Sequence, residues 1–216
     1  GLSGCRLDNG SAAYVGDTRY TESRIDGIVA AYKKDGARLT DERGTRQSIV
    51  TELMFLTLAR RYAQERHLQI PASDYAPLAD QTGLPASDPY LRIHVDAQTY
   101  SQGLIRQASP GPAVTEAQYR EIYQRLVAQG VQQDYPSIKA FLQQNPVGPA
   151  LAVRDQLAAA GKRYGLDVNP KYGALEYPLA QVSTSAGEIF TLVSIPLGQA
   201  GTPAVVDLPT PMAGAQ

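Results

Sequence analysis

The sequence predicts a mainly α-helical protein with a small antiparallel β-sheet formed by its N- and C-terminal strands. Apolar residues recur at the helical period of about 3.6 through most of the chain between 21 and 165. Residues 13–15 favour a short strand, and two further stretches within 176–196 have the pattern of strands. Because an isolated hairpin is only marginally stable in water, the C-terminal strands need a third partner. We therefore expect residues 13–15 to pair with 190–194.

The first elements are defined by turn and cap residues. Gly16 and Asp17 follow the N-terminal strand as a turn, and Thr21 is suited to the N-cap of the first helix, which ends near Gly36. A second helix is expected to begin at Thr40 and to reach about His67, which makes it the longest element.

The central helices have the clearest start signals. Asp88 followed by Pro89 is typical of N-cap and N1 positions, and the resulting helix is expected to run to about residue 107. Thr115 and Gln118 form a capping-box pattern, which starts a helix that ends at Gly130. The remaining expected elements are short helices at 73–80 and 136–142, a longer helix at 147–164, and strands at 176–182 and 188–196 joined by a turn at 184–187.

The charge balance argues against two classes of partner. The 216 residues include 20 Lys and Arg against 21 Asp and Glu, so the chain has no excess positive charge for binding nucleic acid or an anionic membrane surface. No run of eighteen apolar residues occurs, so the sequence predicts no transmembrane helix.

The only cysteine, Cys5, lies in the stretch Leu2-Ser3-Gly4-Cys5, which has the form of a bacterial lipobox. In that interpretation residues 1–4 are the end of a signal peptide, and Cys5 becomes a lipidated N-terminus. A diacylglyceryl group supplies two acyl chains, and at about 0.8 kcal/mol per buried CH₂ these form a durable anchor. The expected organisation is a signal remnant and tether at 1–10, one folded domain at 11–200 and a disordered tail at 201–216. The alternative is a chance match of four residues.

No enzymatic signature is present in the sequence. Glycine-rich phosphate loops, GxSxG, HExxH and CxxC motifs are all absent. His67 and His94 lack companions at metal-ligand spacing, so we expect neither a metal site nor a cofactor. Asp41 and Glu42 are interpreted as first-turn charges that complement a helix dipole. The sequence therefore predicts no catalytic residues.

Three stretches resemble a family of extracytoplasmic chaperones. The segment AAYVGDTRYTESRIDGIVAAY, the long helix RQSIVTELMFLTLARRYAQERHL and the later VNPKYG are similar in order to the SurA N-terminal-like domain of SurA- and PrsA-type foldases. The resemblance covers roughly residues 11–196 and rests on apolar patterns. Members of this family often carry an inserted parvulin isomerase domain, whereas residues 88–165 here have helical patterns instead. We expect no peptidyl-prolyl isomerase activity.

The resemblance implies a lipid-anchored holdase outside the cytoplasm that binds unfolded exported polypeptides. The candidate client-binding residues are Tyr100, Leu104, Tyr119, Tyr123 and Leu126. Tyrosine offers apolar contact with a polar tip, although packing in the core is its more common role. The alternative function is a non-catalytic adaptor or structural lipoprotein that binds a specific folded envelope protein, and homodimerisation stays open.

Lipidation of Cys5 predicts a change of cell fraction. In the full precursor, Cys5→Ala should move the protein from the membrane fraction to the soluble fraction, because the thioether that carries both acyl chains cannot form. Thermal stability should be unchanged. Cell fractionation and immunoblotting measure the share of the protein in each fraction. Retention of the variant on membranes would contradict the assignment.

Overall fold

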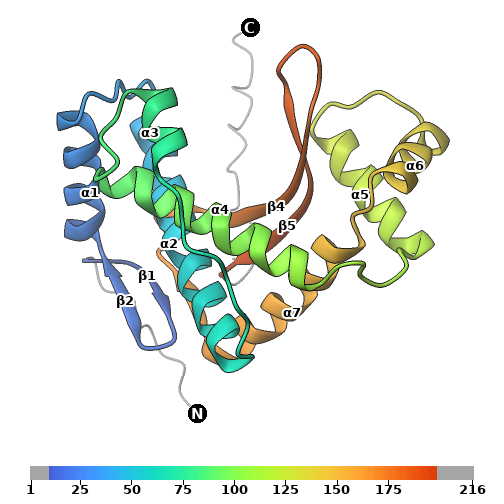
Figure 1. The fold of residues 1–216 in the computed structure, drawn as a ribbon, viewed down its shortest axis with the longest axis horizontal. Helices are drawn as coiled ribbons and strands as arrows, with labels where there is room; N and C mark the ends of the chain where they lie inside the picture. The colour runs from blue at the N-terminus through green and yellow to red at the C-terminus, as the bar shows by residue number, and fades with distance from the viewer. Residues whose placement is uncertain (1–9, 199–216) are drawn as a thin grey trace, which may run out of the picture.

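The computed structural model describes residues 10–198, a range that contains seven α-helices and two small antiparallel sheets (Figure 1). The helices are α1 (Glu22–Lys34), α2 (Glu42–Glu65), α3 (Ala76–Thr82), α4 (Pro89–Gln107), α5 (Glu116–Ala128), α6 (Tyr135–Gln144) and α7 (Gly148–Tyr164). The strands are β1 (Ser11–Val15), β2 (Thr18–Thr21), β3 (Leu166–Val168), β4 (Leu175–Ser183) and β5 (Ile189–Leu197), and a 3₁₀ turn, η1 (Pro170–Tyr172), precedes β4. The mainly helical class is confirmed. The expectations for Cys5 and for the tail at 201–216 lie outside the described residues.

Helix starts follow the capping residues in the sequence. The Thr21 hydroxyl accepts a hydrogen bond from the Arg24 backbone N–H at 3.2 Å, and both halves of the capping box at Thr115 are formed. The Asp88 carboxylate accepts from the Leu91 N–H at 2.8 Å, as its predicted N-cap role requires.

The predicted start of the long helix was wrong by two residues, since α2 begins at Glu42 and not at Thr40. Asp41 is its N-cap, and its carboxylate accepts a hydrogen bond from the Gly44 N–H at 2.9 Å. A carboxylate at this position also interacts favourably with the helix dipole, which a hydroxyl does not. The interpretation of Asp41 and Glu42 as charges at a helix start is confirmed.

The predicted pairing of the N-terminal strand with residues 190–194 was also wrong. The strand order in the first sheet is β2-β1-β3, with Ala13 opposite Val168 and Val15 opposite Leu166. β4 and β5 pair only with each other and form a second sheet. The single sheet expected from the chain ends is therefore two sheets, and the hairpin obtains its support from helices.

Local chain geometry explains this pairing. Gly16 adopts φ +59° in a tight turn, so the chain reverses direction at once. Residues 18–21 then form β2, which pairs with β1. On the other side of β1, the backbone N–H of Asn169 donates to the Ala12 carbonyl at 2.9 Å, and the Asn169 side chain donates to the Ser11 carbonyl at 2.9 Å. Both edges of β1 are thus occupied by neighbouring strands, and β5 cannot pair there.

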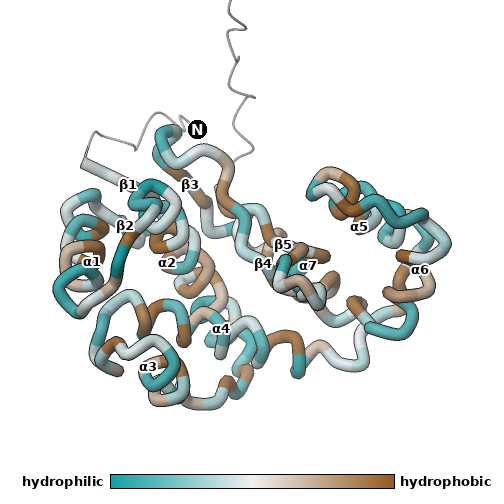
Figure 2. The backbone as a smooth tube through the Cα atoms, turned by 90° about the horizontal axis from the view of Figure 1, so that it is seen from above, coloured by the Kyte–Doolittle hydropathy of each residue, from teal (hydrophilic) through white to brown (hydrophobic). Residues whose placement is uncertain are grey.

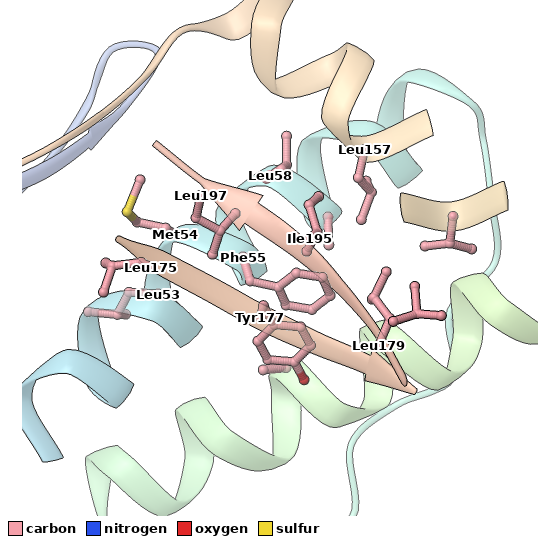
Figure 3. Packing of buried hydrophobic residues seen from close by; sticks show 14 of the residues in the cluster. Leu53, Met54, Phe55, Leu58, Leu157, Leu175, Tyr177, Leu179, Ile195 and Leu197 are labelled. Atoms are coloured by element: carbon pink, nitrogen blue, oxygen red, sulfur yellow. The ribbon is translucent and has the colours of Figure 1, made fainter. Parts of the chain in front are cut away.

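The core is centred on α2 and the β4–β5 hairpin (Figure 3). Phe55 of α2 stacks face to face on Tyr177 of β4, with ring centroids 3.7 Å apart and planes inclined by 4°. Leu157 from α7 and Ile195 from β5 are fully buried in the same cluster. The helices thus supply the apolar face that the hairpin needs for stability.

Helices α5 and α6 form an arm on the far side of the hairpin from α1–α4 (Figure 2). We call residues 112–147 the α5–α6 arm. The chain enters it after Gly111 and leaves it at Gly148, and these two glycines lie at one crossing point. A Cβ atom on Gly111 would approach the Pro149 nitrogen to 2.6 Å, and one on Gly148 would approach the Pro112 carbonyl oxygen to 2.5 Å. Both positions therefore require glycine for close approach of the backbones.

The stacked pair predicts a large effect on stability. Phe55→Ala should lower the free energy of unfolding by about 3–5 kcal/mol, because it leaves a cavity beneath Tyr177 in the centre of the core. Ile189→Ala is the control, since Ile189 is 62% exposed and its loss should change stability by less than about 0.5 kcal/mol. Urea denaturation measures both, and equal effects would contradict this assignment of the core.

Candidate functional site

An apolar cleft of about 720 Å³ lies between the α5–α6 arm and the end of the β4–β5 hairpin. We call it the apolar cleft. Of its lining residues only Glu188 carries a charge. Its apolar lining consists of Leu126, Val131, Ile138, Phe141, Val182, Phe190 and Leu192.

Polar contacts fix the two walls of the apolar cleft. At the start of α5, Glu116 accepts hydrogen bonds from the Tyr135 hydroxyl and the Lys139 ammonium, each at 2.6 Å, which holds α6 against α5. After the end of α5, the Gln129 side-chain amide donates to the Thr191 carbonyl and accepts from the Thr191 N–H, both at 2.8 Å. The arm is therefore attached to β5 through backbone groups that another strand would otherwise bind.

One large apolar side chain of the lining remains exposed, since Phe141 is 36% exposed. Ile189 at the start of β5 is 62% exposed but does not belong to the lining, because it neighbours the lining residue Phe190 and successive side chains of a strand point to opposite faces. Val127 of α5 is also exposed, at 46%, but it does not belong to the cleft lining.

The candidate client-binding residues do not form one surface. Leu104 and Leu126 are each only 2% exposed and belong to the core, so their apolar spacing reflects packing, and the expectation that they contact a client is corrected. Leu126 nevertheless forms part of the buried lining of the apolar cleft.

The three tyrosines are half-buried on different helices. Tyr100 packs against the core from α4, with the Arg60 guanidinium 5.5 Å from its ring centre. Tyr123 makes an edge contact with Tyr135 at 5.4 Å within the arm, and Tyr119 lies beneath the Lys139 ammonium. None of the three tyrosines lines the apolar cleft. Phe141 was missed, because nothing in a local apolar pattern distinguishes an exposed side chain from a buried one.

A second depression, of about 600 Å³, separates α2 and α4 from β4. We call it the polar groove. Its lining includes Ser48, Glu52, His94, Gln98 and Gln181 together with backbone and side chains of 174–179. The polar groove is therefore lined by the first part of β4, whereas the apolar cleft is lined by the end of the hairpin where β4 turns into β5.

An ion pair with a buried carboxylate lies in the polar groove. The Glu52 Oε1 atom lies 2.6 Å from His94 Nδ1, and Gln98 contacts His94 Nε2 at 2.9 Å. The hydrogen bond to Glu52 raises the pKa of His94 above its ordinary value. Burial, together with the charge of Glu52, raises the pKa of Tyr177 as well. The second oxygen, Glu52 Oε2, is buried without a hydrogen-bond partner among the described residues.

The other residues considered from sequence form no cluster. His67 follows α2 with φ +53°, as part of the turn that ends the helix. Within residues 10–198, no group of three or more His, Cys, Asp or Glu side chains is arranged to hold a metal ion. Over the same range, no helix has the length and apolar character needed to cross a membrane.

No family model, curated protein or solved structure matches this chain. The resemblance to SurA N-terminal-like domains therefore stays a prediction from the sequence.

The Glu52–His94 pair predicts a pH-dependent contribution to stability. Because the His94 pKa is raised on folding, this contribution is complete below the unfolded-state pKa of about 6.5 and is lost as the pH rises through the higher folded-state pKa. Titration of the His94 ring followed by NMR should give a pKa above about 6.5. Glu52→Gln should lower it, whereas Gln98→Ala should leave it raised. An unchanged His94 pKa in Glu52→Gln would contradict the pairing.

Proposed function

We propose that this protein is a lipid-anchored holdase outside the cytoplasm that binds unfolded segments of exported polypeptides at the apolar cleft. The observation that carries the proposal is the largely apolar lining of this cleft, which contains a single charged residue and the exposed Phe141. Unfolded chains differ from folded ones in presenting apolar side chains to solvent. A protein that covers such side chains binds the unfolded state preferentially and delays its aggregation.

Binding at this cleft should be weak and tolerant of sequence. Ordering a client costs about 1–2 kcal/mol of backbone entropy per residue. Full burial of one large apolar side chain returns only about 1.5–3 kcal/mol. A cleft with a few apolar contacts therefore holds a segment briefly and releases it, which is the behaviour that a holdase requires.

The proposal also includes lipidation of Cys5 and a location outside the cytoplasm. Both rest on the lipobox at the start of the sequence. We further propose that the protein is not an enzyme and has no isomerase activity, since the sequence offers no catalytic signature. An anchor at Cys5 would place the cleft close to the membrane from which exported chains emerge.

The cleft predicts loss of holdase activity on introduction of charge. Phe141→Asp should bind a chemically reduced, aggregating client about tenfold more weakly, because an apolar contact of the cleft becomes charged. Light scattering at equimolar protein and client measures suppression of aggregation. Val127→Asp is the matched control, since it introduces the same charge at an exposed apolar residue outside the cleft lining and should retain activity. Equal activity of Phe141→Asp and Val127→Asp would contradict the proposal.

A refolding assay separates the holdase from the isomerase and from the adaptor. The proline-limited phase of a refolding protein, which lasts tens to hundreds of seconds at 25 °C, should keep its rate when the protein is added. Acceleration of that phase would overturn the absence of isomerase activity. If client aggregation is unaffected and one folded envelope protein co-purifies stoichiometrically, the adaptor function replaces the holdase.

A further inference from the structure

Strand β4 has one edge bound to β5 and another that faces the polar groove. Within residues 10–198, no residue outside β5 makes a hydrogen bond to the backbone of β4. The groove lining includes residues 174–179 and Gln181, so this edge forms one wall of the groove along most of the strand. An unpaired edge of this kind is a template for an additional strand.

The outer edge of β5 shows which backbone groups of β4 point into the groove. Gln129 binds both the N–H and the carbonyl of Thr191, so these groups point away from β4. In an antiparallel pair, two residues that face each other turn their backbone groups either both inward or both outward. Gln181 faces Thr191, and therefore the N–H and carbonyl of Gln181 point outward, into the groove that Gln181 lines.

The prolines of the hairpin agree with this assignment nearer the start of β4. Proline is tolerated in a strand where its missing N–H would point away from the ladder. Pro196 faces Glu176, and Pro178 faces Ser194, so these two pairs belong to the outward-pointing class. Glu176 then also presents an N–H and a carbonyl to the groove. Gln129 occupies the outward groups of Thr191 in β5, whereas no described side chain occupies the outward groups of Glu176 or Gln181 in β4.

The chemistry of the polar groove favours a basic occupant. Its lining contains two carboxylates, Glu52 and Glu176, and neither lysine nor arginine; the one basic side chain in the lining, His94, binds the Oε1 atom of Glu52 at 2.6 Å. Glu176 is bound by Arg125 at 2.8 Å and by Ser194 at 2.7 Å. Glu52 is 8% exposed, and its Oε2 atom has no partner among the described residues. A buried carboxylate oxygen accepts hydrogen bonds only, so it lacks a donor.

We propose that the polar groove binds an extended polypeptide segment, which adds as a third strand along β4 and directs a lysine or arginine side chain to Glu52. The backbone hydrogen bonds to Glu176 and Gln181 would supply affinity without regard to sequence, and the Glu52 carboxylate would supply a preference for a basic side chain. This inference rests on the proposed binding of polypeptides but uses a surface distinct from the apolar cleft.

Features of β4 limit the segment to a short one. The register shifts at Pro178–Ala180 and again at Ala180–Gln181, and a bulge of this kind interrupts continuous pairing. Pro178 offers a carbonyl but no donor. These features also protect the edge from indefinite addition of further chains, as in other exposed sheet edges.

The first test changes one backbone donor. Gln181→Pro removes the outward N–H without removing a backbone bond to β5. The side-chain bond of Gln181 to the Thr191 hydroxyl, at 3.3 Å, is lost in Gln181→Ala as well. Gln181→Pro should weaken binding of a short, end-blocked peptide of alternating threonine and lysine about tenfold, since the proline ring also obstructs the edge. Gln181→Ala is the control and should bind within about twofold of the original protein, because its backbone donor is intact. Fluorescence anisotropy of the labelled peptide measures both affinities. Equal binding by the two variants would overturn strand addition.

The second test uses the unaltered protein and modified peptides, so it does not depend on the folding of a variant. Only alternate residues of an added strand turn their N–H groups toward β4. N-methylation of one alternate set should therefore abolish binding, and methylation of the other set should preserve it. Replacement of lysine by norleucine in the peptide should weaken its binding to the original protein about fivefold, because the charge-assisted hydrogen bond to the Glu52 carboxylate is lost. The same replacement should hardly change the binding of the peptide to Glu52→Gln, which has no carboxylate at this position. Equal effects of both methylations, or equal lysine preference in both proteins, would overturn the proposal.

Two further readouts distinguish this inference from the proposed function. Gln181→Pro should keep its activity against an apolar aggregating client, and Phe141→Asp should keep its affinity for the lysine peptide. If the lysine peptide fails to bind while aggregation is suppressed, the groove proposal fails and the holdase stands. If no peptide binds and Gln181→Pro instead abolishes a concentration-dependent dimer in sedimentation, the edge pairs with a second copy of this chain, which also overturns the proposal.

Discussion

The stacking of Phe55 on Tyr177 positions the hairpin on which both candidate surfaces depend. A two-stranded sheet cannot support itself in water, so β4 and β5 are stable only because one face packs against α2 and α7. Once that face is fixed, the free end of the hairpin forms a wall of the apolar cleft, and the edge of β4 forms a wall of the polar groove. Loss of the stack would therefore displace both surfaces together.

The two surfaces differ in the part of a polypeptide that they contact. The apolar cleft offers side-chain contacts, with an exposed phenylalanine, and Gln129 binds the β5 backbone of Thr191 there. The polar groove offers backbone groups and a carboxylate as well as apolar side chains. A polypeptide bound at both surfaces would need exposed apolar side chains for the apolar cleft and a basic side chain for the polar groove.

Much of the fold could be predicted because helix ends are determined locally. The caps at Asp88 and Thr115 and the stop at Gly165 each depend on residues within one turn. Strand pairing could not be predicted in this way, since the partner of β1 is a three-residue strand more than 150 positions later in the chain. The hairpin at 176–196 was predicted correctly, but only the structure shows that helices, not β1, cover it.

The candidate site was less predictable than the fold, for a related reason. Leu104 and Leu126 have the spacing of an amphipathic helix, which is the same for a core contact and for a binding surface. Phe141 is exposed because the arm ends where no further element covers it, and this is a property of the assembled chain. The Glu52–His94 pair joins residues 42 positions apart and has no local signature.

Because Gly111 and Gly148 lie at one crossing point, the α5–α6 arm leaves the rest of the protein and returns to it at the same place. The entropy lost on closing such a loop grows only slowly with its length, so the body tolerates arms of different size at this point. The length of the arm can therefore change without separating α4 from α7, provided that its side chains in the core and the bonds of Gln129 to β5 are kept.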